Sequence, residues 1–179
     1  MKSVLISIRP QWVEKIVSGK KTIEVRKTAP KEVPFKAYIY CSYGDMKTNY
    51  YLKGRGKVIG EFICDKVIKT CGWRLRGNTQ QCAKRTPEEE MLPHSACLSI
   101  DEIVNYAGGE NGEICGWHIS DLKIYNKPKP IMQFYKPCPI KIKNCPVCEL
   151  YSTYTGCCMN NIDRPPQSYM FVEEVQDDN

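Results

Sequence analysis

Lysine, glutamate and arginine stand close together in "SGKKTIEVRK", residues 18–27. Glu24 and Arg26 are two residues apart on a predicted strand, so their side chains should emerge on the same face. A carboxylate beside a guanidinium restricts the arginine, which can then offer its planar donors to a phosphate or a base edge. Lys21 would add a point charge nearby. The alternative is an ordinary Glu–Arg pair on an exposed strand, which contributes little.

A second candidate site is the cysteine-rich segment "CPIKIKNCPVCELYSTYTGCC" near the C-terminus. Its five cysteines are Cys138, Cys145, Cys148, Cys157 and Cys158. Cys145 and Cys148 have the CxxC spacing by which two thiolates hold one tetrahedral zinc ion, and the other three cysteines could supply the remaining ligands. The alternative is a set of reduced thiols in a loop. The density of cysteines favours a structural zinc site, which would not be catalytic because protein occupies every position.

The composition predicts a soluble cytoplasmic protein with a substantial hydrophobic core. The chain has 179 residues, of which 42% are hydrophobic, and this length suits one domain. No apolar run approaches the roughly 20 residues of a membrane helix, so no membrane partner is expected. The N-terminus lacks a signal-peptide layout. The eleven cysteines are therefore expected to be mostly reduced or bound to metal.

Positive charge is concentrated at the start of the chain. Residues 1–57 contain 13 Lys or Arg and 4 Asp or Glu, whereas the net charge of the whole chain is +6. Clustered cations indicate a polyanionic partner, because they displace the counterions condensed on phosphates. The alternative is that these lysines only keep the surface soluble.

Periodicity predicts several short strands and few helices. The expected helices run from Pro10 to Gly19 and from Ser99 to Gly108, the second opening with a Ser99–Glu102 capping box. The expected strands are 3–9, 21–27, 37–43, 56–68 with a break at Gly60, 116–125 and 168–175. This pattern favours an α+β fold on a compact barrel, with a ligand cleft between helix, strand and barrel mouth.

The expected organisation is a single domain over residues 1–179 with two insertions. Residues 69–97 show little periodicity and are long for a bare connection, so they read as a loop or a small insertion. Residues 136–164 would be a second, zinc-stapled insertion before the last strand.

The residues Gly19, Lys21, Glu24 and Arg26 match GxKxxExR, which resembles the signature of the ASCH domain family in the PUA-like superfamily. The segments "LISIRPQWVEKIVSG", "GKVIGEF" and "GWHISDL" are also similar to that family. The resemblance covers residues 1–125 in pieces and a final strand near 168–175. It implies a small mixed β-barrel with flanking helices and a cleft that binds RNA or a nucleotide.

In that cleft the resemblance implies roles for Lys21, Glu24 and Arg26. Arg9 is a neighbour by its position at the end of the first strand. Trp12 would be able to stack on a base, although its place on the apolar side of the first helix favours the core. In the middle loop, Trp73, Arg74 and Arg76 combine an aromatic ring with cations, which suits stacking and phosphate contact; the alternative there is a solvent-exposed loop.

Whether the cleft is catalytic is a separate question. Some ASCH proteins resemble N4-acetylcytidine amidohydrolases, in which a Thr nucleophile follows the Lys by three residues. Here Glu24 stands at that position, so we expect no Thr-dependent amidase activity. Lys21 and Glu24 would be the catalytic pair of a different hydrolase, and His118 is the other candidate for a ribonuclease, although its surroundings favour a structural role.

Three functions therefore remain from sequence. The first is a module that binds RNA or a nucleotide. The second is a hydrolase that acts on a modified nucleoside or on RNA at the same cleft. The third is a zinc-containing protein-interaction adaptor.

Overall fold

The structure is a computed structural model that describes residues 1–43, 54–71, 85–109, 111–137 and 162–174. Helices and strands alternate irregularly along these residues, which confirms the predicted α+β class. The chain divides into two compact units. The first comprises Met1–Gln11, Lys36–Phe62 and Lys123–Asn179, and the second comprises Trp12–Phe35 and Ile63–Leu122.

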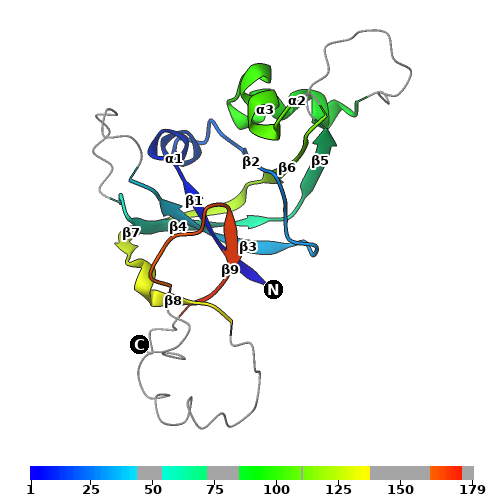
Figure 1. Ribbon diagram of the computed structural model, residues 1–179. Coiled ribbons are helices and arrows are strands. Elements are labelled where there is room, and N and C mark those ends of the chain that lie inside the picture. Colours follow the sequence, from blue (N-terminus) through cyan, green and yellow to red (C-terminus); the bar gives the residue numbers. More distant parts are fainter. Residues whose placement is uncertain (44–53, 72–84, 110, 138–161, 175–179) are drawn as a thin grey trace. The chain divides into compact units, whose positions relative to one another are not determined.

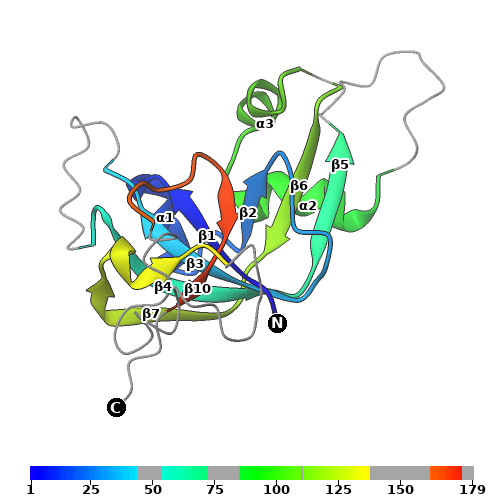
Figure 2. The same ribbon diagram turned by 60° about the horizontal axis from the view of Figure 1, so that its bottom comes forward.

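Most of the first unit is a five-stranded sheet made of β1 (Ser3–Ile8), β3 (Phe35–Cys41), β4 (Lys57–Cys64), β7 (Ser120–Lys129) and β9 (Tyr169–Phe171). The strand order is β7-β4-β3-β1-β9. β1 runs parallel to β3 and antiparallel to β9, and both views show it between them (Figures 1 and 2). The strands that the structure describes form separate linear sheets, so the predicted closed barrel is not confirmed.

A small two-stranded sheet also belongs to the first unit. It pairs β8 (Phe134–Tyr135) with β10 (Glu173–Glu174), after the short 3-10 helix η1 (Ile131–Gln133). One core cluster joins the two sheets of this unit and consists of Leu5, Tyr38, Tyr40, Val58, Phe134, Ile162 and Val172.

The second unit contains a three-stranded antiparallel sheet and helices. The strands are β2 (Ile23–Arg26), β5 (Val67–Cys71) and β6 (Glu113–His118), in the order β2-β6-β5. The helices are α1 (Pro10–Val17), which begins in the first unit, α2 (Pro87–Ala96) and α3 (Ile100–Ala107). In this unit, α2 and α3 lie near each other at one end of β5 and β6 (Figure 1). The core between helices and sheet is formed by Ile23, Val25, Leu92, Ala96, Ile103 and Ile114.

The ends of the predicted helices follow the sequence signals. Pro10 is the first residue of α1, and Gly19 follows the helix with φ +73°, a conformation that suits glycine. Ser99 and Glu102 form the predicted capping box of α3, and Gly108 ends it in the left-handed region. None of the helices in the described ranges is both long enough and apolar enough to span a membrane.

Helix α2 was not predicted. It lies within residues 69–97, which the sequence indicated as a loop or an insertion. Only Leu92 and Ala96 of this helix are buried, and Pro93 lies inside it, so the helical periodicity is weak. The available signal was the capping box of Thr86 and Glu89 together with Pro87 at the first helical position.

One predicted strand break was wrong in position, and a second break was not predicted. The predicted long strand 56–68 is divided between β4 and β5 at Asp65 and Lys66, and Gly60 lies inside β4. A Cβ on Gly60 would lie 2.5 Å from the main-chain oxygen of Lys123. Gly60 is therefore needed for a close approach of β7 rather than for a break. The predicted strand 116–125 is likewise two strands, which separate at Ile119.

Candidate functional site

Lys21, Glu24 and Arg26 form one buried ionic cluster in the second unit. Lys21 Nζ lies 3.4 Å from Glu24 Oε2, and Arg26 Nη2 lies 3.1 Å from Glu24 Oε1. The three residues are 3%, 7% and 6% exposed, respectively. The structure thus brings together the three residues of the sequence motif, and the alternative of an ordinary exposed pair is wrong.

Strand pairing holds the acidic and the basic residue of β2 in place. In the register of β2 with β6, Glu24 lies opposite Trp117 and Arg26 lies opposite Cys115. Trp117 is fully buried and packs edge-on against Phe35, with 4.9 Å between the ring centroids. Among the strands that the structure describes, β2 is at the edge of its sheet and pairs only with β6.

Lys21 is fixed by the turn that follows α1. Its main-chain N–H donates to Lys15 O at 2.9 Å, and its Nζ donates to Ala96 O, at the end of α2, at 2.8 Å. Helix carbonyls of a last turn are favourable partners for a cation. Burial lowers the pKa of Lys21, and the neighbouring Glu24 opposes that shift. Lys21 is therefore a desolvated amine whose charged form Glu24 favours.

Two aromatic side chains border the cluster. Trp12 is half-buried, and Lys15 Nζ and Lys21 Nζ lie 4.6 Å and 5.4 Å from its ring centroid. It is not among the buried core residues, so the expectation that favoured a core position for Trp12 was wrong. Tyr106 on α3 is 40% exposed, and Lys27 Nζ lies 5.9 Å from its ring.

Tyr106 was missed from sequence because it is distant from the motif. Burial raises the pKa of Tyr106, and the charge of Arg26 opposes this while that of Glu24 adds to it. The phenol is therefore close enough to the cluster for both charges to act on it. The only sequence signal was its place near the end of a capped helix, which does not identify a site.

The structure does not test the other predicted ligand-binding residues. Arg9 is exposed directly after β1, in the first unit, and its role stays a prediction. Trp73, Arg74 and Arg76 lie outside the described residues, as do the proposed zinc ligands Cys138, Cys145, Cys148, Cys157 and Cys158. Among the residues that are described, no group of three or more His, Cys, Asp or Glu side chains is placed to hold a metal ion.

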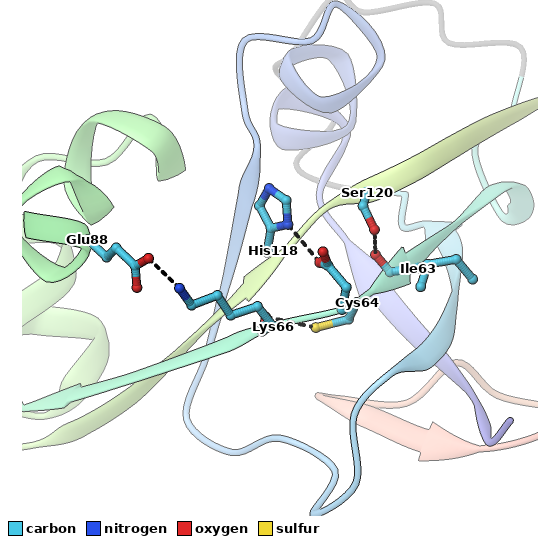
Figure 3. Close-up of polar contacts among 7 residues, drawn as sticks. Ile63, Cys64, Lys66, Glu88, His118 and Ser120 are labelled. Carbon is cyan, nitrogen blue, oxygen red and sulfur yellow. Dashed lines mark hydrogen bonds and ion pairs between the residues drawn. The ribbon is translucent and has the colours of Figure 1, made fainter.

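His118 takes part in a separate polar network at the end of β6 (Figure 3). Its Nδ1 lies 2.7 Å from Asp65 Oδ1, and the two side chains are 43% and 51% exposed. The hydrogen bond from His118 lowers the pKa of Asp65. Ser120 Oγ donates to Ile63 O at 2.8 Å. His118 is thus a surface histidine held by a carboxylate rather than a core histidine.

The backbone around this histidine is also fixed. His118 N–H donates to Lys66 O at 3.0 Å, and Lys66 forms an ion pair with Glu88 on α2 (Figure 3). With Nδ1 held by Asp65, the Nε2 atom of the ring is the one left for a ligand or a proton. An aspartate that orients a histidine in this way is a common arrangement of acid–base pairs.

Comparison with solved structures finds ASCH domains. The chain is similar to a single-residue mutant of the ASCH protein from Zymomonas mobilis, with 18% identity over 97% of this chain and 91% of that chain and a TM-score of 0.55. It is also similar to ASCH from Zymomonas mobilis, with 19% identity, coverage of 96% and 88% respectively, and a TM-score of 0.51. No protein-family model and no curated protein matches the chain. The chain therefore has the fold of ASCH domain structures, as the motif in residues 19–26 predicted.

Proposed function

We propose that the second unit binds RNA or a nucleotide at the Lys21–Glu24–Arg26 cluster. The observation that carries the proposal is the charge balance of the cluster. One carboxylate faces two cations, and all three side chains are less than a tenth exposed. A positive charge with little solvent around it is strongly attracted to an anionic group such as a phosphate.

The surroundings of the cluster suit a nucleotide better than a simple anion. Trp12 and Tyr106 offer ring surfaces, and a base stacked on an aromatic side chain contributes about 1–3 kcal/mol. Exposed Lys20 and Lys27 add positive charge on either side of the motif. Glu24 is held through both oxygens, so its suggested role is to position Lys21 and Arg26 rather than to attack a substrate.

Fluorescence anisotropy with a labelled nucleotide and a labelled single-stranded RNA tests this proposal. We expect Arg26→Met to weaken binding of both ligands at least about tenfold, since it removes a charge-assisted contact, and Trp12→Ala to weaken it about 5- to 150-fold. Lys31→Met is the matched control, because Lys31 is an exposed lysine of the same unit that lies outside the motif. Equal affinity of wild type and Arg26→Met, with both proteins folded by circular dichroism, would place the site elsewhere.

A hydrolase is the second candidate, and the Asp65–His118 pair favours it. The pair lies in the same unit as the cluster and holds one ring nitrogen in place at 2.7 Å. The experiment is turnover of N4-acetylcytidine and of RNA by the wild type and by His118→Gln. A hydrolase is supported if the turnover rate falls in His118→Gln while ligand affinity is unchanged. If the wild-type protein releases no product from either substrate, the hydrolase is excluded and only the binding function remains.

The cysteine-rich segment carries a third proposal. We infer that four of its five cysteines bind one structural zinc ion, from the CxxC spacing of Cys145 and Cys148. A segment that zinc holds in a fixed conformation would offer a contact surface to another protein. The chain would then act as a protein-interaction adaptor.

A further inference from the structure

Cys97 follows α2 in a backbone conformation that glycine adopts more easily. Its φ is 54° and its ψ is 37°, which lies in the left-handed region where a Cβ crowds the backbone. Among the residues that the structure describes, Asp121 is the only other non-glycine residue with a positive φ. At the matching position after α3 the chain has Gly108. A conformation of this kind persists only where surrounding contacts hold it.

Part of the explanation is the way in which α2 ends. Cys97 N–H donates to His94 O, and Leu98 N–H donates to Pro93 O, both at 3.0 Å. This pair of hydrogen bonds is the Schellman motif, which requires a left-handed residue at the position of Cys97. The motif satisfies two of the four carbonyls that a helix leaves without partners at its C-terminal end.

The other two carbonyls of this helix end are bonded to the start of the GxKxxExR motif. Ser95 O accepts from Thr22 N–H at 2.9 Å, and Ala96 O accepts from Lys21 Nζ at 2.8 Å. All four terminal carbonyls of α2 therefore have partners. The last of them holds the ammonium group of Lys21, which also contacts Glu24.

The side chain of Cys97 extends this contact by one residue. Its Sγ donates to Lys20 O at 3.3 Å. Three successive residues at the end of α2, 95–97, thus bind three successive residues of the motif, 20–22. A glycine would complete the Schellman motif without strain, but it has no side-chain donor. The bond to Lys20 is therefore the feature that a cysteine supplies and a glycine does not.

The end of α2 is itself packed firmly against the sheet of the second unit. Leu92 and Ala96 are fully buried, and the Leu92 side chain lies so close to β6 that a Cβ on Gly116 would meet it at 2.9 Å. Close-packed side chains of this kind leave little room for movement. Because the helix end is fixed, the position of residues 20–22 depends on the contacts that join them to it.

We propose that Cys97 is a positioning residue of the ligand site and that it acts through Lys21. The thiol holds the main chain at Lys20 on the end of α2, and the ammonium group of Lys21 thereby stays in contact with Ala96 O and with Glu24. The inference rests on the proposed function and deepens it. It adds to the ligand site a residue from another element that carries none of the charges of the motif.

The experiment measures the affinity of the full chain for a labelled mononucleotide and for a labelled single-stranded RNA by fluorescence anisotropy. We expect Cys97→Ala and Cys97→Gly to weaken binding of both ligands about 2- to 5-fold, the lower part of the range for one hydrogen bond, because a thiol is a weak donor. Cys97→Ser restores a donor and should recover the affinity of the wild type. Cys71→Ala is the matched control, because Cys71 is an exposed cysteine of the same unit.

Two further measurements distinguish positioning from a purely structural role. Cys97→Gly relieves the left-handed strain, so its midpoint of urea unfolding should equal or exceed that of the wild type although its affinity falls. Hydrogen exchange followed by mass spectrometry reports on residues 20–24, which include the bonded amide of Thr22. This segment should exchange faster in Cys97→Gly and Cys97→Ala than in the wild type and Cys97→Ser.

The outcomes also separate this inference from the proposed function. If the wild type binds a ligand and Cys97→Gly binds it equally well, the role of Cys97 is overturned and the proposed function stands. The same holds if Cys97→Ser loses as much affinity as Cys97→Ala, or if affinity and urea midpoint fall together in Cys97→Gly. Wild-type protein that binds neither ligand overturns both proposals.

Discussion

The guanidinium of Arg26 lies 3.1 Å from the carboxylate of Glu24, and the ammonium of Lys21 approaches the same carboxylate to 3.4 Å. Glu24 is therefore shared by two cations in a site from which most water is excluded. Buried charges are tolerated only when they are paired. Glu24 is the residue on which both pairs depend, so its removal should have a larger effect than removal of either cation.

Replacement of Glu24 by Ala should destabilise the protein by about 3–5 kcal/mol, because it removes the carboxylate that both buried cations contact. Lys21→Met should cost less, since Glu24 keeps Arg26 as a partner and the methionine fills most of the lysine volume. Urea denaturation followed by circular dichroism measures both. Equal and small losses in the two variants, within about 0.5 kcal/mol of wild type as for surface sites, would mean that the cluster is solvated.

Local sequence signals predicted the ends of α1 and α3 and the residues of the ionic cluster. Proline and glycine bound α1, the Ser99–Glu102 capping box opens α3, and the GxKxxExR spacing gave the ionic cluster. These features depend on residues that are close in the chain, where steric limits and hydrogen bonds are decided locally.

The features that the sequence did not predict depend on contacts between residues that are far apart in the chain. Gly60 resembles a strand break in sequence, but the main chain of Lys123 decides its role. The burial of Glu24 and Arg26 follows from the pairing of β2 with β6 and from Lys21 reaching Ala96. Tyr106 lies beside Lys27, next to the motif, from a helix about 80 residues later in the chain, and periodicity does not carry that information.

Gly60→Ala should destabilise the protein by about 1–3 kcal/mol, because the new methyl group would overlap the main-chain oxygen of Lys123 at 2.5 Å. Gly116→Ala is the comparison. Its Cβ would meet the side-chain ends of Leu92 and Ile23 at 2.9 Å and 3.0 Å, and side-chain ends can shift. A smaller loss for Gly60→Ala than for Gly116→Ala in thermal unfolding would contradict the close approach of β7 to β4.

Cys64 should make the protein less stable at alkaline pH. Burial raises the pKa of this thiol from 9.0 to about 12. Above pH 9 the unfolded chain loses the proton and the folded chain keeps it, so the free energy of unfolding falls as the pH rises. Lys21 acts in the opposite direction, because its pKa is lowered in the folded state.

Comparison with Cys64→Ala isolates the thiol from Lys21. Between pH 8 and pH 10 the free energy of unfolding of the wild type should fall by about 1 kcal/mol more than that of Cys64→Ala. Parallel pH profiles for the two proteins would show that the thiol titrates in the folded state as it does in the unfolded chain.

Accessibility should divide the five cysteines that the structure describes. Cys41, Cys64 and Cys115 are buried, Cys97 is partly exposed, and Cys71 is exposed. Because the thiolate is the reactive form and burial raises the pKa of Cys41 to about 11, iodoacetamide at pH 8 should modify Cys71 first and leave Cys41 and Cys64 unmodified. Peptide mapping by mass spectrometry gives the order, and early modification of Cys64 in folded protein would be inconsistent with its burial.

The purified protein should contain one zinc ion per chain, bound through Cys145 and Cys148. Elemental analysis measures the metal, and Cys145→Ser/Cys148→Ser should lose it. Because the metal binds the folded state, a chelator should also lower the unfolding temperature of the wild type but not that of the double variant. Cys41→Ala is the control, since Cys41 is buried in β3 and should leave the zinc content unchanged. Metal-free wild-type protein that unfolds at the same temperature with and without added zinc would exclude the site, and so would equal zinc in the wild type and the double variant.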